Sequence, residues 1–448
     1  MSLSFKEQND LAFASFLDRY FIDNFKKRPK DNRRGMEIII TADCNLECKY
    51  CYLQKRKEAL YPQDIREPET ILKNIGILFD WIIKNGLRLK IDLFSGEIFS
   101  GTLGLKVLWL IYDKYKNVPD DNRILRIMIP TNMSFLTDAE QTKKVVEILE
   151  KLKGLGITVS LSASIDGKHL EINRPYKKQE EDRNDEYYET LFQFLDDFNV
   201  GCHPMVSSMN IAHWKENYQW YIGMLDKYRK KSTLPLVPMM LEVRDDDWTD
   251  ETIKEYLAFL DYVVNNEFAR TGKDVKSFAH RVFVKPLIAY DNVSLIQRYG
   301  PNNGITCAIQ KMLYVRAGDL AIVPCHRTMY DPFILGRFVV KNDEIVGVEG
   351  SNVALAYAIH SMKGELQPGC EDCAIEPLCT KGCLGSQFES TGDLFVPAES
   401  VCRLYKARTV FLLNKYLEMG ILQEGFNILP EKSKETLARV CREVGINA

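Results

Sequence analysis

The stretch of sequence that decides the fold is residues 41–52, which read TADCNLECKYCY. Cys44, Cys48 and Cys51 in this stretch have the spacing C-x3-C-x2-C, and they follow an apolar run that predicts a buried strand. Three thiolates on one loop can bind three irons of a [4Fe–4S] cluster and leave the fourth iron open to a small molecule. A zinc loop is the alternative, but structural zinc takes four ligands and the first histidine downstream is His169. The loop therefore predicts an iron–sulfur cluster with an open coordination site.

Beyond this loop, short apolar runs alternate with helical patterns of apolar residues. The runs that predict strands, each followed by a helical pattern, lie at residues 37–41, 87–94, 124–129, 157–164, 200–206 and 236–243. Such pairs predict parallel strands with right-handed crossovers, and they are too few for a closed eight-stranded barrel. The expected fold class is α/β, a partial (β/α)6 TIM-like barrel with its chemistry at the carboxyl ends of the strands. Within it, Thr137 and Glu140 predict a capping box that opens one of the helices.

The pattern along the chain predicts five segments. Residues 1–35 read as an N-terminal helix and a basic linker, and residues 36–265 as the partial barrel. Residues 266–300 are expected to be a bridging helical segment. Residues 301–410 have weak periodicity and many cysteines, which is typical of a small domain held together by metal groups. Residues 411–448 predict C-terminal helices.

Composition limits the kind of protein this can be. The 448 residues carry a net charge of -3, so nucleic acid is not an expected partner. No signal peptide and no apolar run long enough for a bilayer are recognisable, which predicts a cytoplasmic protein that does not bind membranes. The chain has 12 cysteines, most of them in two clusters. Because the cytosol keeps thiols reduced, clustered cysteines there favour metal ligation over disulfides.

The first cysteine cluster resembles the cluster loop of the radical S-adenosylmethionine (SAM) superfamily. The spacing matches, and Tyr50 is the aromatic residue that the family has before its last cysteine. The resemblance implies that Cys44, Cys48 and Cys51 hold a catalytic [4Fe–4S] cluster whose open iron chelates SAM. It also implies that one electron cleaves SAM to a 5′-deoxyadenosyl radical, which abstracts a hydrogen atom from the substrate.

The same resemblance implies SAM-binding residues at the ends of successive strands. Ser95-Gly96-Glu97 is similar to the family's Gly-Gly-Glu element, with serine in place of the first glycine, and Ser164 and Asp166 match its Ser-x-Asp-Gly element. Arg174 follows where the family has an arginine that pairs with the SAM carboxylate. Taken singly, each of these would read as an ordinary turn. With the polar pair after the third strand, the implied cofactor-binding set is Tyr50, Ser95, Gly96, Glu97, Thr131, Asn132, Ser164, Asp166 and Arg174.

The second cysteine cluster resembles the SPASM extension of radical SAM enzymes, which carries auxiliary clusters. The four-cysteine core has the family spacing C-x2-C-x5-C-x3-C, whereas the interval from Gly318 to Cys325 departs from the family. The family's ligation implies one auxiliary [4Fe–4S] cluster on four cysteines and a second on three, which leaves that cluster an iron for a substrate thiolate. A zinc ribbon is the alternative. The implied ligands are Cys370, Cys373, Cys379 and Cys402 for the first, and Cys307, Cys325 and Cys383 for the second; Cys202 and Cys441 read as buried apolar residues.

SPASM enzymes act mostly on peptides, so the resemblance implies a peptide maturase that forms Cys thioether crosslinks in a ribosomally synthesised precursor, of the sactipeptide or ranthipeptide type. An anaerobic sulfatase-maturating enzyme, which makes formylglycine, is one alternative. Those relatives have a catalytic aspartate after the second cysteine of the module, where this chain has His326. The resemblance is also compatible with a SPASM enzyme that forms carbon–carbon bonds. A degenerate iron–sulfur scaffold would be the non-enzymatic interpretation.

The expected partners follow from this function. They are a Cys-containing precursor peptide and an external one-electron donor, flavodoxin or ferredoxin. About 35 residues precede the barrel, too few for a leader-binding domain. Leader recognition is therefore expected from a separate protein or from the barrel and residues 266–300. The general base stays open among His326, His203 and Glu242.

Overall fold

The fold is described from a computed structural model of the chain. The structure describes residues 3–26, 35–177, 183–231, 241–244, 247–275, 308–362, 367–379, 382–429 and 431–446. The predicted bridging segment lies outside these residues from position 276 onward, as does Cys307. None of the described helices combines the length and the apolar character that crossing a bilayer requires.

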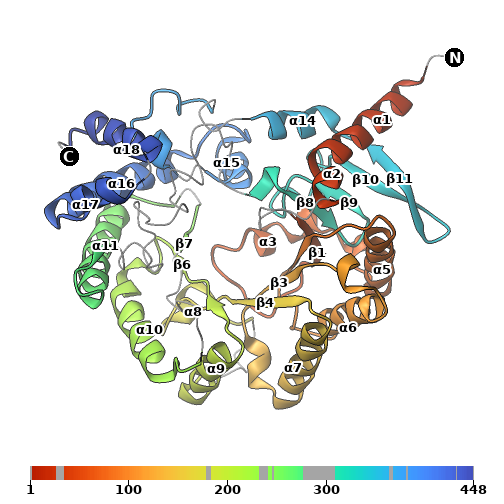
Figure 1. The fold of residues 1–448 in the computed structure, drawn as a ribbon, viewed down its shortest axis with the longest axis horizontal. Coiled ribbons are helices and arrows are strands. Elements are labelled where there is room, and N and C mark those ends of the chain that lie inside the picture. The colour runs from red at the N-terminus through yellow and green to blue at the C-terminus, as the bar shows by residue number, and fades with distance from the viewer. Residues whose placement is uncertain are drawn as a thin grey trace. The chain divides into compact units, whose positions relative to one another are not determined.

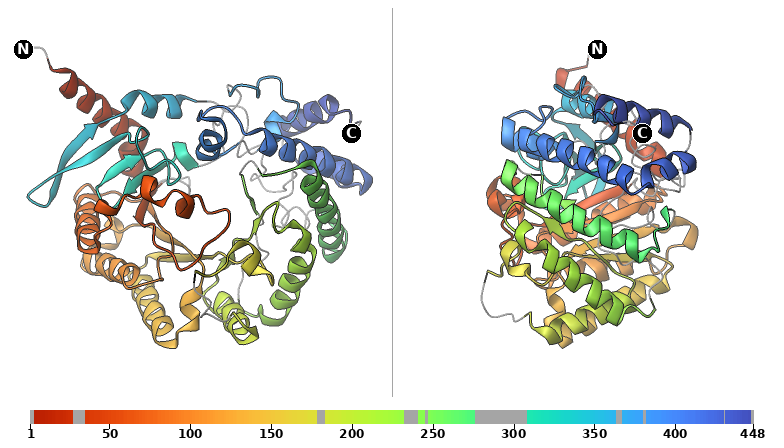
Figure 2. Two further views of the ribbon diagram at one scale, coloured as in Figure 1. Left: turned by 180° about the vertical axis from the view of Figure 1, so that it is seen from behind. Right: turned by 90° about the vertical axis from the view of Figure 1, so that its left-hand side faces the viewer.

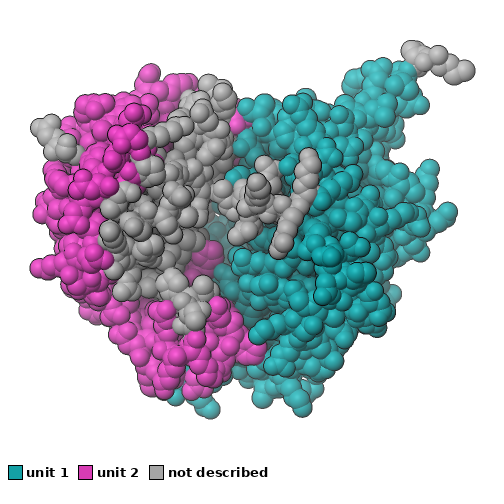
Figure 3. Space-filling model, viewed as in Figure 1, with its two compact units in different colours: residues 1–164, 176–191, 308–361 teal, residues 165–175, 192–307, 362–448 magenta. Residues whose placement is uncertain are grey.

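The chain divides into two compact units, which are coloured separately in Figure 3. Unit 1 comprises Met1–Ser164, Tyr176–Leu191 and Ala308–Ser361. Unit 2 comprises Ile165–Pro175, Phe192–Cys307 and Met362–Ala448. The units group residues by packing, and the domain boundaries read from the sequence stay predictions.

The sheet of unit 1 contains the first four of the six parallel strands that the sequence predicted (Figure 1). Strand β1 (Gly35–Thr41) lies between β8 (Met312–Arg316) and β2 (Lys90–Ser95) and is parallel to both. β2 is followed by β3 (Arg126–Thr131) and β4 (Thr158–Ala163), again parallel. Because parallel strands begin at the same edge, the loops that follow β1 to β4 emerge at one edge of the sheet.

Antiparallel strands extend the other side of this sheet. β8 pairs with β9 (Ala321–Val323), which pairs with β10 (Gly336–Lys341) and then β11 (Glu344–Gly350). The sequence reading, which expected weak periodicity after residue 300, did not include these strands. Cys325, which follows β9 after Pro324, thereby belongs to the same compact unit as the first cysteine cluster.

Helices cover the sheet of unit 1, and Figure 2 shows further views. The buried face of α5 (Pro68–Lys84) is apolar, and Glu67 caps its start by accepting bonds from the N–H groups of Glu69 and Thr70. The predicted capping box was wrong, because Asp138 rather than Thr137 caps the helix that ends at Gly154. The remaining helices of this unit are α1 (Phe5–Leu17), a π-helical turn (Asp18–Ile22), α2 (Asp23–Lys26), α3 (Tyr52–Lys55), α4 (Lys57–Leu60), α6 (Leu103–Tyr115), α7 (Ala139–Gly154) and α14 (Val353–Ser361).

Unit 2 is mainly helical. The fifth predicted strand is split into β5 (Gly201–Cys202) and β6 (Met205–Val206) around Pro204, which lacks an N–H for a ladder. β6 pairs in parallel with β7 (Leu241–Glu242), the described part of the sixth predicted strand. Its helices include α8 (Leu170–Asn173), α10 (Trp214–Tyr228), α11 (Asp250–Arg270), α15 (Leu384–Thr391), α16 (Glu399–Glu418), α17 (Ile421–Ile428) and α18 (Glu431–Glu443), whereas α9 (Asp185–Asp197) crosses the boundary between the units.

Candidate functional site

The first cysteine cluster lies on the loop that leaves the carboxyl end of β1. The N–H of Cys51 donates to the carbonyl of Cys48 at 3.0 Å, and Cys51 then precedes α3 directly. Burial raises the pKa of Cys44 to about 12, with contributions from the nearby thiolates of Cys48 and Cys51. The three thiols therefore lie within electrostatic range of one another, as ligands of a single cluster must.

The donor set, three thiols on one loop, is chemically suited to an iron–sulfur cluster. Among the described residues, no three His, Cys, Asp or Glu side chains converge on the position of one metal ion. In a [4Fe–4S] cluster each thiolate binds a different iron, so the sulfur atoms stand apart around the cluster. Cys44, Cys48 and Cys51 are all partly exposed thiols, which leaves them accessible for such a group.

Several polar contacts fix the cluster loop. Gln54 of α3 donates to the carbonyl of Ala42 at 2.8 Å, and the Lys57 ammonium of α4 lies 2.5 Å from the Asp43 carboxylate. Asn45 donates to the hydroxyl of Ser134 at 2.9 Å. The helices that follow the loop and the segment after β3 thus hold both of its sides.

The element after β2 packs against the start of this loop. The N–H of Gly96 donates to the Thr41 carbonyl at 2.9 Å, and that of Glu97 donates to the Asp43 carbonyl at 2.8 Å. A Cβ on Gly96 would lie 2.2 Å from the Asp43 carbonyl oxygen, so only glycine fits here. The hydroxyl of Ser95 is buried and lacks a hydrogen-bond partner among the described residues, as expected where a polar ligand completes a site.

Glu97 organises the end of β3. Its Oε1 accepts from the Thr131 hydroxyl at 2.8 Å and from the Phe99 N–H at 3.1 Å. Its Oε2 accepts from the Asn132 N–H at 2.6 Å, which leaves this oxygen able to accept a further donor such as an ammonium. Burial raises the pKa of Glu97 although these donors lower it. Three predicted SAM-binding residues, Glu97, Thr131 and Asn132, therefore come together.

The remaining predicted SAM-binding residues are divided between the units. Ser164, in unit 1, donates its N–H to the Thr131 carbonyl at 2.8 Å, and Tyr50 is half-buried in the same unit. In unit 2, Arg174 lies 2.9 Å from the fully buried carboxylate of Asp166. The two are thus partners of each other, and the pairing of Arg174 with a SAM carboxylate stays a prediction.

The second cysteine cluster comes together in unit 2. Burial raises the pKa of Cys402, at the start of α16, and the thiolates of Cys379 and Cys373 raise it further. Cys370 belongs to the same turn as Cys373, whose N–H donates to the Cys370 carbonyl at 3.2 Å. The set predicted for the first auxiliary cluster is therefore clustered in one unit.

The second predicted auxiliary set is not brought together within one unit. Cys325 belongs to unit 1, where the Arg327 N–H lies 3.4 Å from its sulfur. Cys383 belongs to unit 2, where it caps the start of α15, and Cys307 is outside the described residues. Cys202 and Cys441 are buried, as expected for apolar roles.

The sequence reading missed one pair, the buried Glu37 and the partly exposed His326. Nδ1 of His326 lies 2.6 Å from Oε1 of Glu37, and the imidazole stacks on Phe94 with ring centroids 4.3 Å apart. A carboxylate only accepts hydrogen bonds, so Nδ1 carries the proton. The available signal was a glutamate at the start of an apolar strand. Burying its carboxylate costs free energy unless the carboxylate has a partner.

The other two candidates for the general base have different surroundings. Glu242 is buried against Arg408 and accepts from the Tyr256 hydroxyl at 2.6 Å, an arrangement that stabilises unit 2. His203 is half-buried, and desolvation together with the nearby Arg174 lowers its pKa. Of the three candidates, only His326 lies in unit 1 with the first cysteine cluster.

Comparison with known proteins gives a consistent group of relatives. No protein-family model matches the sequence. The chain is 22% identical over 389 residues to the radical SAM cyclopropyl synthase TigE of Paramaledivibacter caminithermalis, a match that covers 83% of this chain and 72% of that protein. The fold of this chain is similar to that of anSMEcpe with bound AdoMet, with a TM-score of 0.57 at 14% identity. This match covers 90% of this chain and 98% of that chain. The structure of anSMEcpe with AdoMet and the Cp18Cys peptide is similar with a TM-score of 0.55 at 15% identity. This match covers 88% of this chain and 99% of that chain.

Proposed function

We propose that this radical SAM enzyme modifies a ribosomally synthesised precursor peptide by forming thioether crosslinks from its cysteines. The structure of anSMEcpe with a bound peptide supports a peptide substrate. The cluster and SAM, when bound, supply the radical chemistry that removes a hydrogen atom from the peptide. The chain's own residues bind, orient and shield these groups.

Each element at the edge of the sheet has a part in this proposal. Cys44, Cys48 and Cys51 hold the catalytic cluster, and Gly96 lets the strand that carries Glu97 approach their loop. Glu97 has acceptor capacity left on Oε2 for the SAM ammonium, while it fixes the Thr131 hydroxyl. Two auxiliary clusters on the second set of cysteines would take the electron that thioether formation releases.

The number of cysteines carries the thioether proposal. Three serve the catalytic cluster, four serve the first auxiliary cluster, and Cys307, Cys325 and Cys383 are left for the second. Cys202 and Cys441 are both buried, which fits apolar roles, and they are not counted as ligands. The second auxiliary cluster would therefore have one iron for a substrate thiolate.

The test uses the anaerobically reconstituted full-length protein, a low-potential electron donor, SAM and the short peptides encoded beside its gene. Thioether formation removes two hydrogens from the peptide: one leaves as an atom, the other as the thiol proton, and one electron passes to the enzyme. We expect this mass loss together with loss of one alkylatable thiol per crosslink. A protein that yields no 5′-deoxyadenosine from SAM would instead be a scaffold, and the proposal would be wrong.

Carbon–carbon bond formation is the second candidate, because the matched relative TigE is named a cyclopropyl synthase. Ring closure between carbons also removes two hydrogens, so mass alone does not separate the two reactions. Alkylation of the product with iodoacetamide does, because every cysteine thiol survives carbon–carbon bond formation. A sulfatase-derived peptide converted to formylglycine would favour the sulfatase-maturating alternative, for which the structural likeness to anSMEcpe gives the fold alone.

A further inference from the structure

We propose that Arg316 is a positioning residue that fixes the Cys325 turn to the helices following the catalytic cluster loop. The inference rests on the proposed function, because it takes Cys325 as an auxiliary-cluster ligand. Arg316 is the last residue of β8, and its side chain is 4% exposed. A buried guanidinium needs several acceptors, and here they come from three separate segments of unit 1.

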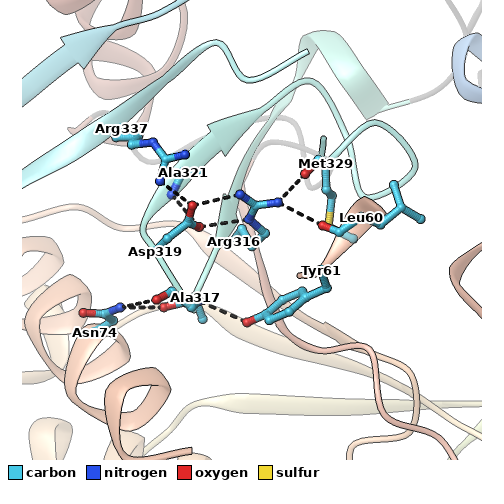
Figure 4. Close-up of polar contacts among 10 residues, drawn as sticks. Leu60, Tyr61, Asn74, Arg316, Ala317, Asp319, Ala321, Met329 and Arg337 are labelled. Carbon is cyan, nitrogen blue, oxygen red and sulfur yellow. Dashed lines mark hydrogen bonds and ion pairs between the residues drawn. The ribbon is translucent and has the colours of Figure 1, made fainter. Parts of the chain in front are cut away.

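The first acceptor is Asp319, which holds the guanidinium in a fixed orientation (Figure 4). Nε and Nη2 of Arg316 contact the two carboxylate oxygens of Asp319 at 2.9 and 2.8 Å. The same carboxylate also pairs with Arg337. Although burial raises the pKa of Asp319, these cations bring it below its usual range, so the carboxylate stays charged. This two-bond pairing points Nη1 away from Asp319.

Nη1 joins the other two segments. It donates to the carbonyl of Leu60, the last residue of α4, at 2.9 Å, and also to the carbonyl of Met329 (Figure 4). One nitrogen thus bridges two backbone segments that lie far apart in sequence. Leu60 and Met329 are both fully buried and belong to one apolar cluster, so water has little access to replace these bonds.

Each bridged segment leads to a cluster ligand. On one side, α4 is tied to the catalytic cluster loop by the ion pair between Lys57 and Asp43. On the other side, Met329 directly follows a turn in which the Thr328 N–H donates to the Cys325 carbonyl at 3.1 Å. Arg316 therefore fixes the spacing of two ligand-bearing segments, independently of any substrate.

Aromatic contacts show that these segments also meet directly. Tyr52 follows Cys51, and the guanidinium of Arg327 lies 4.9 Å from the centre of its ring. The ring of His326 stacks on the same tyrosine at 5.9 Å. Such contacts tolerate sliding, whereas hydrogen bonds from a fixed guanidinium do not. Arg316 is thus the residue that fixes the position of the Cys325 turn relative to the helices that follow the cluster loop.

The test compares the Arg316→Lys and Asp319→Asn variants of the full-length, anaerobically reconstituted protein. A lysine keeps the charge opposite Asp319 but lacks the planar fork that reaches both carbonyls. We expect Arg316→Lys to lose up to about one third of the bound iron, as one of three clusters. The electron paramagnetic resonance signal of one auxiliary cluster should weaken or change shape, while 5′-deoxyadenosine formation without peptide stays within about twofold.

Asp319→Asn is the matched control, because it removes the charge of the buried pair, whereas the amide oxygen still accepts one bond that orients the guanidinium towards its two carbonyl acceptors. It should melt at a lower temperature than the wild type and retain its full iron content and spectrum. Full iron with an unchanged spectrum in Arg316→Lys, or equal iron loss in both variants, would overturn the inference. A wild-type protein that takes up iron for a single cluster would instead refute the cofactor set under the proposed function.

Discussion

Gly96 approaches Asp43 so closely that a side chain between them has no space: a Cβ on Gly96 would lie 2.2 Å from the Asp43 carbonyl oxygen. This contact joins the element after β2 to the cluster loop. We predict that Gly96→Ala displaces the loop, because backbone rather than a flexible side chain opposes the methyl group, and lowers stability by about 1–3 kcal/mol. Iron content after reconstitution should fall by up to about one third, the share of one of three clusters.

Gly101 provides the control for this prediction. A Cβ at Gly101 would have no neighbour within 4 Å. Gly101→Ala should bind iron and cleave SAM like the wild type. Normal iron content in Gly96→Ala would contradict the role given to the contact with Asp43.

The pair of Asp166 and Arg174 gives a prediction that distinguishes a role of Arg174 in stability from a role in SAM binding. The Asp166 carboxylate is fully buried, and Arg174 lies 2.9 Å from it. Removing one partner leaves the other charge buried alone, which costs about 3–5 kcal/mol. We therefore expect Arg174→Gln to lower the melting temperature markedly. The double variant Arg174→Gln/Asp166→Asn should lose less stability than the sum of the losses in the two single variants. Unchanged melting with weakened SAM binding would show that Arg174 serves the cofactor alone.

His360 makes the packing of the N-terminal helix sensitive to acid. Its ring lies among Phe16, Tyr20 and Phe21, with centroids 4.8, 5.0 and 5.2 Å away. Burial lowers the pKa of His360 from 6.5 to about 4. Between these values the unfolded chain binds a proton that the folded protein excludes, so stability falls as pH drops from 6.5 towards 4. The full loss is about 3 kcal/mol.

The measurement compares melting temperatures of the wild type and His360→Phe between pH 7.5 and pH 5. Because phenylalanine cannot take up a proton, the variant should lose less stability over this range, by about 2 kcal/mol. The ionic strength is kept constant, since screening would change the contributions of surface charges. Equal pH dependence in the two proteins would mean that the folded protein accepts a protonated imidazole among these three aromatic rings.

The sequence was sufficient to predict the elements whose signal is local. The first four predicted strands correspond to β1, β2, β3 and β4, because apolar runs mark them in the sequence. The close packing of the Ser95-Gly96-Glu97 element on the cluster loop agrees with the resemblance, because glycine there has a steric reason. This part of the site could be predicted because its residues lie at the ends of consecutive strands, and each strand is marked by a local sequence pattern.

Features that depend on distant partners could not be predicted in this way. Glu37 and His326 are 289 positions apart, and nothing local shows that a strand glutamate will find an imidazole. Arg316 likewise joins segments whose contact exists only in the folded chain. The split of the fifth strand at Pro204 was visible in the sequence, since proline breaks a ladder, and was overlooked.

Cys402 tests whether the second cysteine cluster binds iron. It lies in the first turn of α16, within electrostatic range of Cys373 and Cys379. Burial raises its pKa, so a bound metal has to stabilise the thiolate if Cys402 is a ligand. We expect Cys402→Ala to lose about four of about 12 irons per chain, the content of one cluster.

Cys441→Ala is the matched control for Cys402→Ala. Cys441 is 1% exposed on α18, and burial raises its pKa as it raises that of the partly exposed Cys402, so both variants remove such a thiol from a helix. Only Cys402 has other cysteines of the second cluster near it, and only its loss should change the iron content. If the reconstituted wild type held one zinc ion there in place of iron, and Cys402→Ala left the iron unchanged, the block would be a zinc ribbon. The electron released by crosslinking would then have no auxiliary cluster in unit 2 to receive it.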